Sequence, residues 1–193
     1  MPVAQCKRSK QLLARIRQTL PDKKVSHCVF AAEFLSSFAP SLGLDHDEAV
    51  EAGLLHDLCR GMDGTELLME ARRLRLPVSE VQMERPVLLH GPVAAEWIRS
   101  EFGVSDAVHE AVYWHTTGRP GLGLLGQGLC LADFAEPTRK YPEADEARAL
   151  LRRDGFPAAV RYMAEMKLVF SARKEVSDPN TEAFCLWLRG GGA

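Results

Sequence analysis

Two adjacent residues, His56 and Asp57, have the side chains best suited to sharing a metal ion. They lie in a segment with helical periodicity that we expect to run from residue 45 to about 60. At about 100° per residue, the side chains of His56 and Asp57 project on either side of the direction of Gly53, so both can point toward the same place. A glycine inside a helix is costly, which makes sense if another group must approach that face closely. Arg60 follows on the same face.

A second pair of the same type, His46-Asp47, provides a comparison. It lies in the polar start of the same predicted helix, where Asp45 and Glu48 resemble a capping box. Acidic residues there favour the helix dipole and cap the free N–H groups. We therefore expect a structural role for His46-Asp47 and a chemical one for His56-Asp57.

Four further residues extend the set of candidate metal ligands. His27, His90 and His115 could each, taken alone, be a core or cap histidine, whereas Asp133 lies in the apolar run 128–134, where an unpaired carboxylate is expensive to bury. With His56-Asp57 they make an imidazole and carboxylate set, without cysteine in register, that suits iron, manganese or cobalt rather than structural zinc. Two ions about 3.5–4 Å apart would use all six, as in hydrolysis of a phosphate ester or anhydride.

The elements that must position these residues are all predicted to be helices. Apolar residues recur at intervals of three and four, while alternating, strand-like runs are missing. Pro, Gly and capping residues divide the chain, and the segment 116–126 contains four glycines and a proline, which predicts a loop. We expect helices over residues 12–20, 24–38, 45–60, 65–76, 92–103, 106–115, 127–135, 143–154, 157–173 and 180–189.

Composition limits the class of protein. The 193 residues are 46% hydrophobic with a net charge of −2, and they show no linker or repeat, which indicates one domain over residues 1–193. The longest apolar runs are about five residues, so neither a membrane span nor a signal sequence is expected, and we expect a cytoplasmic protein. No global positive field points to nucleic acid. Five cysteines without a Cys-x-x-Cys pair support no disulfide framework.

The order of the six candidate ligands resembles that of the HD-domain metal-dependent phosphohydrolases, an all-α superfamily with a helical-bundle fold. Four strings, at 53–57, 88–91, 115–121 and 132–139, look more specifically like the YqeK-type family of symmetrical bis(5′-nucleosyl)-tetraphosphatases. They read Gly-Leu-Leu-His-Asp, Leu-Leu-His-Gly, His-Thr-Thr-Gly-Arg-Pro-Gly and Ala-Asp-Phe-Ala-Glu-Pro-Thr-Arg. The resemblance covers about residues 24–170.

This resemblance implies a hydrolase that splits diadenosine tetraphosphate into two ADP, by attack of a hydroxide bound to two divalent or mixed-valence metal ions. Iron is implied first, with manganese or cobalt as alternatives. Asp57 is implied as the bridging ligand. The implied metal ligands are His27, His56, Asp57, His90, His115 and Asp133, with His56, Asp57 and Arg60 in catalysis and Lys24, Thr117, Gly118, Arg119 and Arg139 binding the substrate.

The loop residues agree with a phosphate-binding role, since Gly118 and Gly121 would let the backbone approach a phosphate while Thr117 and Arg119 offer donors. Arg60 stands where relatives often carry Lys, and Lys24 where Arg is common. Tryptophans 97, 114 and 187 are expected in the core, and none is assigned to the substrate.

Two alternatives remain at this point: another HD-type nucleotide phosphohydrolase, and a metal-dependent nucleotide sensor without turnover. In each, the partner is a nucleotide, a dinucleoside polyphosphate on the first interpretation. Base preference and oligomeric state, including a homodimer, are left open.

Overall fold

A computed structural model describes residues 7–172 and 178–192. Within these residues the protein has eleven α-helices, two short 3-10 helices and no strand, which confirms the all-α prediction. The expected end of one helix at residue 173, and Cys6, lie outside the described residues. The elements are α1 (Lys7–Thr19), α2 (Asp22–Phe38), η1 (Ala39–Leu42), α3 (His46–Leu55), α4 (Gly64–Arg73), α5 (Glu80–Glu84), η2 (Pro86–Leu89), α6 (His90–Phe102), α7 (Asp106–Trp114), α8 (Leu124–Ala135), α9 (Pro142–Arg153), α10 (Phe156–Ala172) and α11 (Pro179–Arg189).

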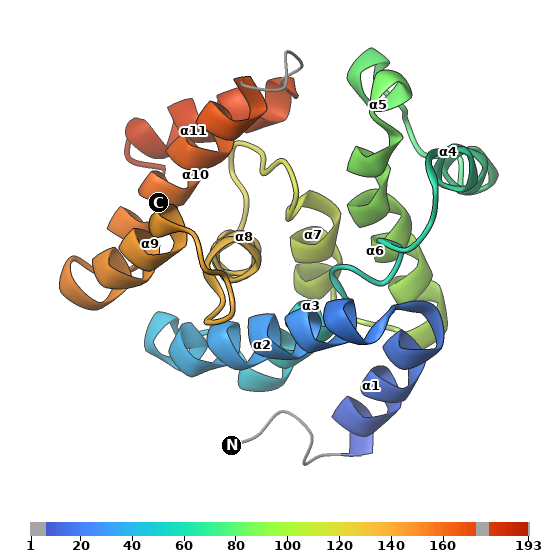
Figure 1. Ribbon diagram of the computed structural model, residues 1–193, viewed down its shortest axis with the longest axis horizontal. Coiled ribbons are helices and arrows are strands. Elements are labelled where there is room, and N and C mark those ends of the chain that lie inside the picture. Colours follow the sequence, from blue (N-terminus) through green and yellow to red (C-terminus); the bar gives the residue numbers. More distant parts are fainter. Residues whose placement is uncertain (1–6, 173–177, 193) are drawn as a thin grey trace.

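Helix α8 lies in the middle of the molecule, between α9, α10 and α11 on one side and α4, α5 and α6 on the other (Figure 1). From Leu125 to Ala135 all its residues except Asp133 are buried. A helix that is apolar all round must be covered on every side. Accordingly, Leu125 and Leu129 pack into one hydrophobic core with α1–α4, α6 and α7, while Leu131 and Phe134 pack into a second with α9–α11.

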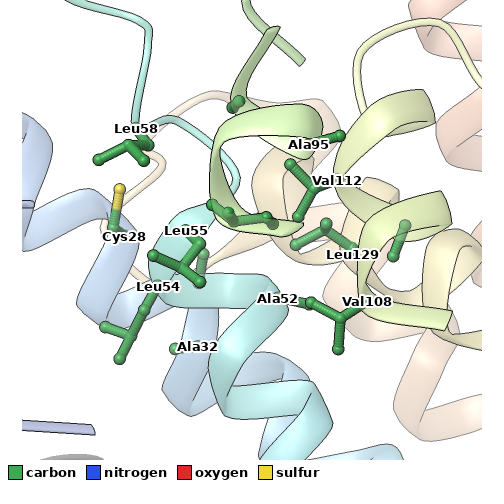
Figure 2. Close-up of a cluster of buried hydrophobic side chains, with 14 of the residues drawn as sticks. Cys28, Ala32, Ala52, Leu54, Leu55, Leu58, Ala95, Val108, Val112 and Leu129 are labelled. Atoms are coloured by element: carbon green, nitrogen blue, oxygen red, sulfur yellow. The ribbon is translucent and has the colours of Figure 1, made fainter. Parts of the chain in front are cut away.

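Helices α2 and α3 pack closely because both carry small residues where they cross. Figure 2 shows Ala32 of α2 beside Leu54 of α3, whereas Ala52 lies toward Val108 of α7. A Cβ atom built on Gly53 would lie 2.3 Å from the Cα atom of Ala32. We expected another group to approach the face of Gly53 closely. That group is the backbone of α2, not a ligand.

The third helix is shorter than predicted, since α3 ends at Leu55 instead of near Arg60. Beyond it the chain turns through i to i+3 hydrogen bonds, in which Leu58 N–H donates to the Leu55 carbonyl and Arg60 N–H to that of Asp57. His56 and Asp57 are thus at and just beyond the helix end, and the prediction that Asp57 and Arg60 continue a face of this helix is wrong. At the other end, Asp45 caps the helix as expected, accepting from the N–H groups of residues 47 and 48.

Helix α8 begins at Leu124, three residues earlier than predicted. Described cysteines 28, 59, 130 and 185 are buried free thiols. In the part of the chain that the structure describes, no helix combines the length and apolar character needed to cross a membrane.

We expect Gly53→Ala to lower the free energy of unfolding by about 1–3 kcal/mol, because the added methyl group meets backbone that can yield only if α2 and α3 separate. The gain in helix propensity of about 1 kcal/mol offsets part of this loss. Gly126→Ala is a matched control, since the atoms nearest to its Cβ belong to the side chain of Leu122 and not to backbone. Chemical denaturation measures both, and an equal or smaller loss for Gly53→Ala would contradict the packing argument.

Candidate metal centre

Six side chains from five parts of the chain converge where the two hydrophobic cores meet. Three of the histidines are at helix ends: His56 directly follows α3, His90 begins α6, and His115 follows α7. All three are almost completely buried. The complete set is His27 of α2, His56, Asp57, His90, His115 and Asp133 of α8.

One group of ligand atoms forms around His27 and His56, whose Nε2 atoms are 3.2 Å apart. The Oδ1 atom of Asp133 lies 3.1 Å from the Nε2 atom of His27 and 3.8 Å from that of His56. The Oδ2 atom of Asp57 lies 4.0 Å from the Nε2 atom of His56. Two imidazoles and two carboxylates therefore face a common point.

The second group forms around the other oxygen of Asp57. Its Oδ1 atom lies 3.2 Å from the Nε2 atom of His90 and 4.0 Å from that of His115. The two Nε2 atoms are 3.0 Å apart. Asp57 thus presents one carboxylate oxygen to each histidine pair, which is the arrangement of a carboxylate that bridges two metal ions.

The outer nitrogen of each ligand histidine has an oxygen partner. The Nδ1 atoms of His56 and His115 lie 2.8 Å from the carbonyl oxygens of Gly53 and Val112, respectively. His90 makes the same kind of bond to Val87. Carbonyl oxygens only accept, so each of these Nδ1 atoms carries the proton and the Nε2 lone pair faces the cluster, as metal-ligating histidines require.

His27 differs, because its Nδ1 partner is a carboxylate. Glu136 directly follows α8 and is fully buried. Its Oε1 atom lies 3.2 Å from the Nδ1 atom of His27. The same carboxylate accepts hydrogen bonds from the backbone N–H and the hydroxyl of Thr138. Glu136 therefore orients His27, a role that the sequence analysis did not assign.

Electrostatics keep most of the cluster in the protonation states that bind metal. His27 is the exception, because burial lowers its pKa but Asp133 more than offsets this and the pKa is raised. Burial lowers the pKa of both His56 and His115, so their imidazoles are neutral near pH 7. Burial alone would raise the pKa of Asp57, but His56 and His90 more than offset it and the pKa falls below its ordinary value. Burial would also raise the pKa of Asp133, but the hydrogen bond with His27, together with electrostatic interactions with His56, Lys167 and His115, more than offsets it and the pKa falls. Neutral imidazoles and ionised carboxylates are the forms that coordinate metal.

The cluster opens into a cavity of about 320 Å³. Its wall includes Asp57, His90, His115 and Asp133, together with Thr116, Thr117 and apolar residues such as Phe170. Four cationic side chains also line it: Arg60, Arg85, Arg139 and Lys167. The cavity therefore combines a metal-ligand cluster with a positively charged wall, which suits a phosphorylated ligand.

Thr117 and Arg139, which were expected to bind substrate, line this cavity, as does Arg60, which was expected to act in catalysis. A terminal nitrogen of Arg139 lies 3.1 Å from the Oδ1 atom of Asp133 and 3.3 Å from the Nε2 atom of His27, so its guanidinium already reaches the cluster. Thr117 is buried, and its hydroxyl donates to the carbonyl of Gly118.

Lys24, Gly118 and Arg119 have other contacts. The Nζ atom of Lys24 donates to the carbonyl oxygen of Arg60 and so holds the turn after α3. Arg119 is hydrogen-bonded to Glu110, and its guanidinium carbon lies 5.9 Å from the ring centre of Trp114. The roles of these residues toward a substrate stay predictions.

The packing of the loop requires a glycine at position 118, which the sequence did not reveal. Its φ is +71°, and an added Cβ would lie 2.2 Å from the ring of Phe184 in α11. The missing side chain lets the loop pack against α11, whereas around Gly121 there is open space.

Lys167 of α10 was also missed. Its Nζ atom donates to the carbonyl oxygens of His115 at 2.7 Å and Thr116 at 3.4 Å, which fixes the end of α7 beside the cluster. The available signal was a lysine in the mostly apolar stretch 163–170, in which Glu165 is the other charged residue. The comparison pair, by contrast, lies on the surface, with the His46 Nδ1 atom 3.2 Å from the carboxylate of Asp47 and both side chains exposed.

Comparison with known proteins places this geometry in context. The profile of the HD domain family matches residues 25–155. A Bacillus subtilis (strain 168) protein named "Bis(5'-nucleosyl)-tetraphosphatase, symmetrical" is 29% identical, over 94% of this chain and 97% of the relative. A relative of the same name from Halalkalibacterium halodurans is 30% identical, over 74% and 76%.

A solved structure has the same fold. It is described as a "predicted HD superfamily hydrolase involved in NAD metabolism" from Clostridium acetobutylicum, and it superposes with a TM-score of 0.88 at 23% sequence identity. The match covers 94% of this chain and 97% of that one. The arrangement of helices that holds the cluster is therefore shared.

The two His-Asp pairs give a matched test of metal binding. We expect Asp57→Ala to lose bound metal, because it removes the one carboxylate that faces both histidine pairs. Asp47→Ala should keep its metal and cost only about 0.3–1 kcal/mol of stability through the helix dipole. Elemental analysis of protein purified without chelator gives the metal-to-protein ratio, and equal metal loss in two folded variants would contradict the assignment.

Proposed function

The chain belongs to the HD domain family, and from this premise we propose that it is a metal-dependent hydrolase that cleaves diadenosine tetraphosphate symmetrically into two ADP. The observation that carries the proposal is the carboxylate of Asp57, whose two oxygens face two separate histidine pairs. The names of the relatives from Bacillus subtilis and Halalkalibacterium halodurans support the choice of substrate.

The donor set fits two metal ions. His27, His56 and Asp133 would hold one, His90 and His115 the other, and Asp57 both. We propose iron first, with manganese or cobalt as alternatives, because imidazole and carboxylate ligands suit these metals. When bound, such a pair lowers the pKa of a shared water and draws charge from phosphoryl oxygens.

The residues of the chain then have three tasks: to orient the imidazoles, to limit the access of water and to bind the polyphosphate. Glu136 and the carbonyls of Gly53, Val87 and Val112 hold the imidazoles in the required tautomer. Burial keeps water away from most of the cluster, which strengthens the electrostatic interactions inside it.

The cationic wall binds and orients the polyphosphate. Arg60, Arg139 and Lys167 belong to three different segments, so their charges surround the ligand from several sides. Arg139 contacts Asp133 and His27, so its guanidinium would lie beside a phosphate held by the metal ions. Fixed charges of this kind stabilise the charge that develops during phosphoryl transfer.

We expect Arg139→Ala to lower kcat/KM for diadenosine tetraphosphate by an amount equivalent to about 1–3 kcal/mol, the range for a charge-assisted hydrogen bond. Both metals should stay bound, because the Nε2 and carboxylate ligands remain. Arg161→Ala, at an exposed position of α10, is the control for loss of a positive charge. Metal loss from Arg139→Ala with unchanged kinetics for the loaded fraction would assign Arg139 a structural role instead.

The position of bond cleavage tests the reaction itself. Attack at a phosphorus beside the central bridging oxygen leaves two ADP molecules, one of which gains the oxygen of water. Hydrolysis in ¹⁸O-labelled water should therefore yield ADP as the only nucleotide product, with one label per bond cleaved, on a β-phosphate. Chromatography and mass spectrometry measure both.

Two other outcomes would change the proposal in defined ways. ATP and AMP as initial products would show off-centre attack and leave a different nucleotide phosphohydrolase. Nucleotide binding without turnover, at full metal occupancy, would show a sensor.

A further inference from the structure

A second cavity lies beside the one that contains the metal cluster. Its volume is about 280 Å³, and Leu88 and Thr117 line both cavities. The second cavity is formed by the segment that leads into α5, the end of α7 and the start of α11. In Figure 1, α5 and α11 lie on opposite sides of the loop that follows α7. A ligand anchored at the metals could therefore extend past Thr117 into this second space.

The wall of the second cavity includes two consecutive aromatic residues, Tyr113 and Trp114. Their ring centroids are 4.8 Å apart, and both side chains are only half-buried. Pro77, Pro92 and Leu88 add flat or apolar surface. Trp114 is thus not a fully buried core residue as expected, and aromatic walls of this kind stack on nucleobases in proteins that bind unpaired bases.

Two side-chain amides in the same wall have their orientation fixed by their partners. The Oε1 atom of Gln82 accepts a hydrogen bond from the backbone N–H of Ser79 at 2.9 Å, so its Nε2 atom is the end left to donate. The Nδ2 atom of Asn180 donates to the carboxylate of Asp178 at 3.0 Å, so its Oδ1 atom is the end left to accept. Among the described residues, neither of these remaining atoms has a hydrogen-bond partner.

An amide donor and an amide acceptor beside an aromatic wall match a flat base whose edge presents one donor next to one acceptor. Adenine is flat, and its edge presents an amino donor next to a ring-nitrogen acceptor. Its amino group can donate to an amide oxygen while the ring nitrogen accepts from an amide nitrogen. The aromatic faces supply stacking that does not depend on these hydrogen bonds.

We propose that this second cavity binds the adenine of one of the two nucleotides, with Trp114 as the stacking residue and Gln82 and Asn180 as the residues that contact the edge of the base. This inference rests on the proposed function for the identity of the base. Thr117, at the junction of the two cavities, marks where the phosphates pass toward the metal cluster.

Calorimetry on the metal-loaded protein tests the proposal with two probes, ADP and inorganic pyrophosphate, which lacks the base. Trp114→Leu should weaken ADP binding by about ten- to a hundredfold, or remove one of two ADP equivalents, while pyrophosphate affinity stays unchanged. Gln82→Glu should weaken ADP by about tenfold. It keeps the oxygen that accepts from Ser79 and replaces only the donating nitrogen.

Gln18→Glu, at an exposed position of α1, adds the same charge elsewhere and should leave both affinities unchanged. Unchanged ADP affinity and stoichiometry in folded Trp114→Leu and in Gln82→Glu would overturn the proposal, as would equal losses for ADP and pyrophosphate. These readings are separate from catalysis. A protein that binds ADP in a Trp114-dependent way but does not cleave diadenosine tetraphosphate would retain the base site and lose the proposed function.

Discussion

The structure depends on one carboxylate, that of Asp57, being shared between two buried pairs of histidines. Such a group can stay ionised in the interior only if several donors or cations surround it. The chain meets this need by ending helices at the cluster. Carbonyls in the last turn of a helix lack helical partners, and those of Gly53 in α3 and Val112 in α7 accept from the imidazoles of His56 and His115. The same hydrogen bonds therefore satisfy carbonyl groups at the helix ends and orient the imidazoles of the cluster.

The cluster is built from elements of both hydrophobic cores. Asp133 projects from α8, which belongs to both cores, and Lys167 from α10 reaches back to the carbonyls of residues 115 and 116. Elements from both cores must therefore be in place before all six ligands converge. Since a metal ion binds tightly only when all these side chains are assembled, we infer that metal binding and folding are energetically linked in this protein.

The sequence predicted what depends on residue type and local pattern. It predicted the all-α class, most helices and the six side chains that converge. It did not predict what lies opposite a given residue. Gly53 and Gly118 were interpreted as openings for a ligand, yet α2 and Phe184 occupy those spaces, and such long-range contacts have no local signature. Lys24 and Glu136 illustrate the same limit, because their partners, Arg60 and His27, are distant in sequence.

Helix α8 has a further consequence for how the chain can vary. Because its residues from Leu125 onward face protein on every side, with Asp133 facing the cavity, it has no face where a substitution meets only water. Tolerance to substitution must therefore be concentrated in peripheral helices such as α1 and α9, whose outer sides are polar and exposed. Attempts to stabilise or resurface this protein should begin at the periphery, and a library that varied α8 would yield mostly misfolded chains.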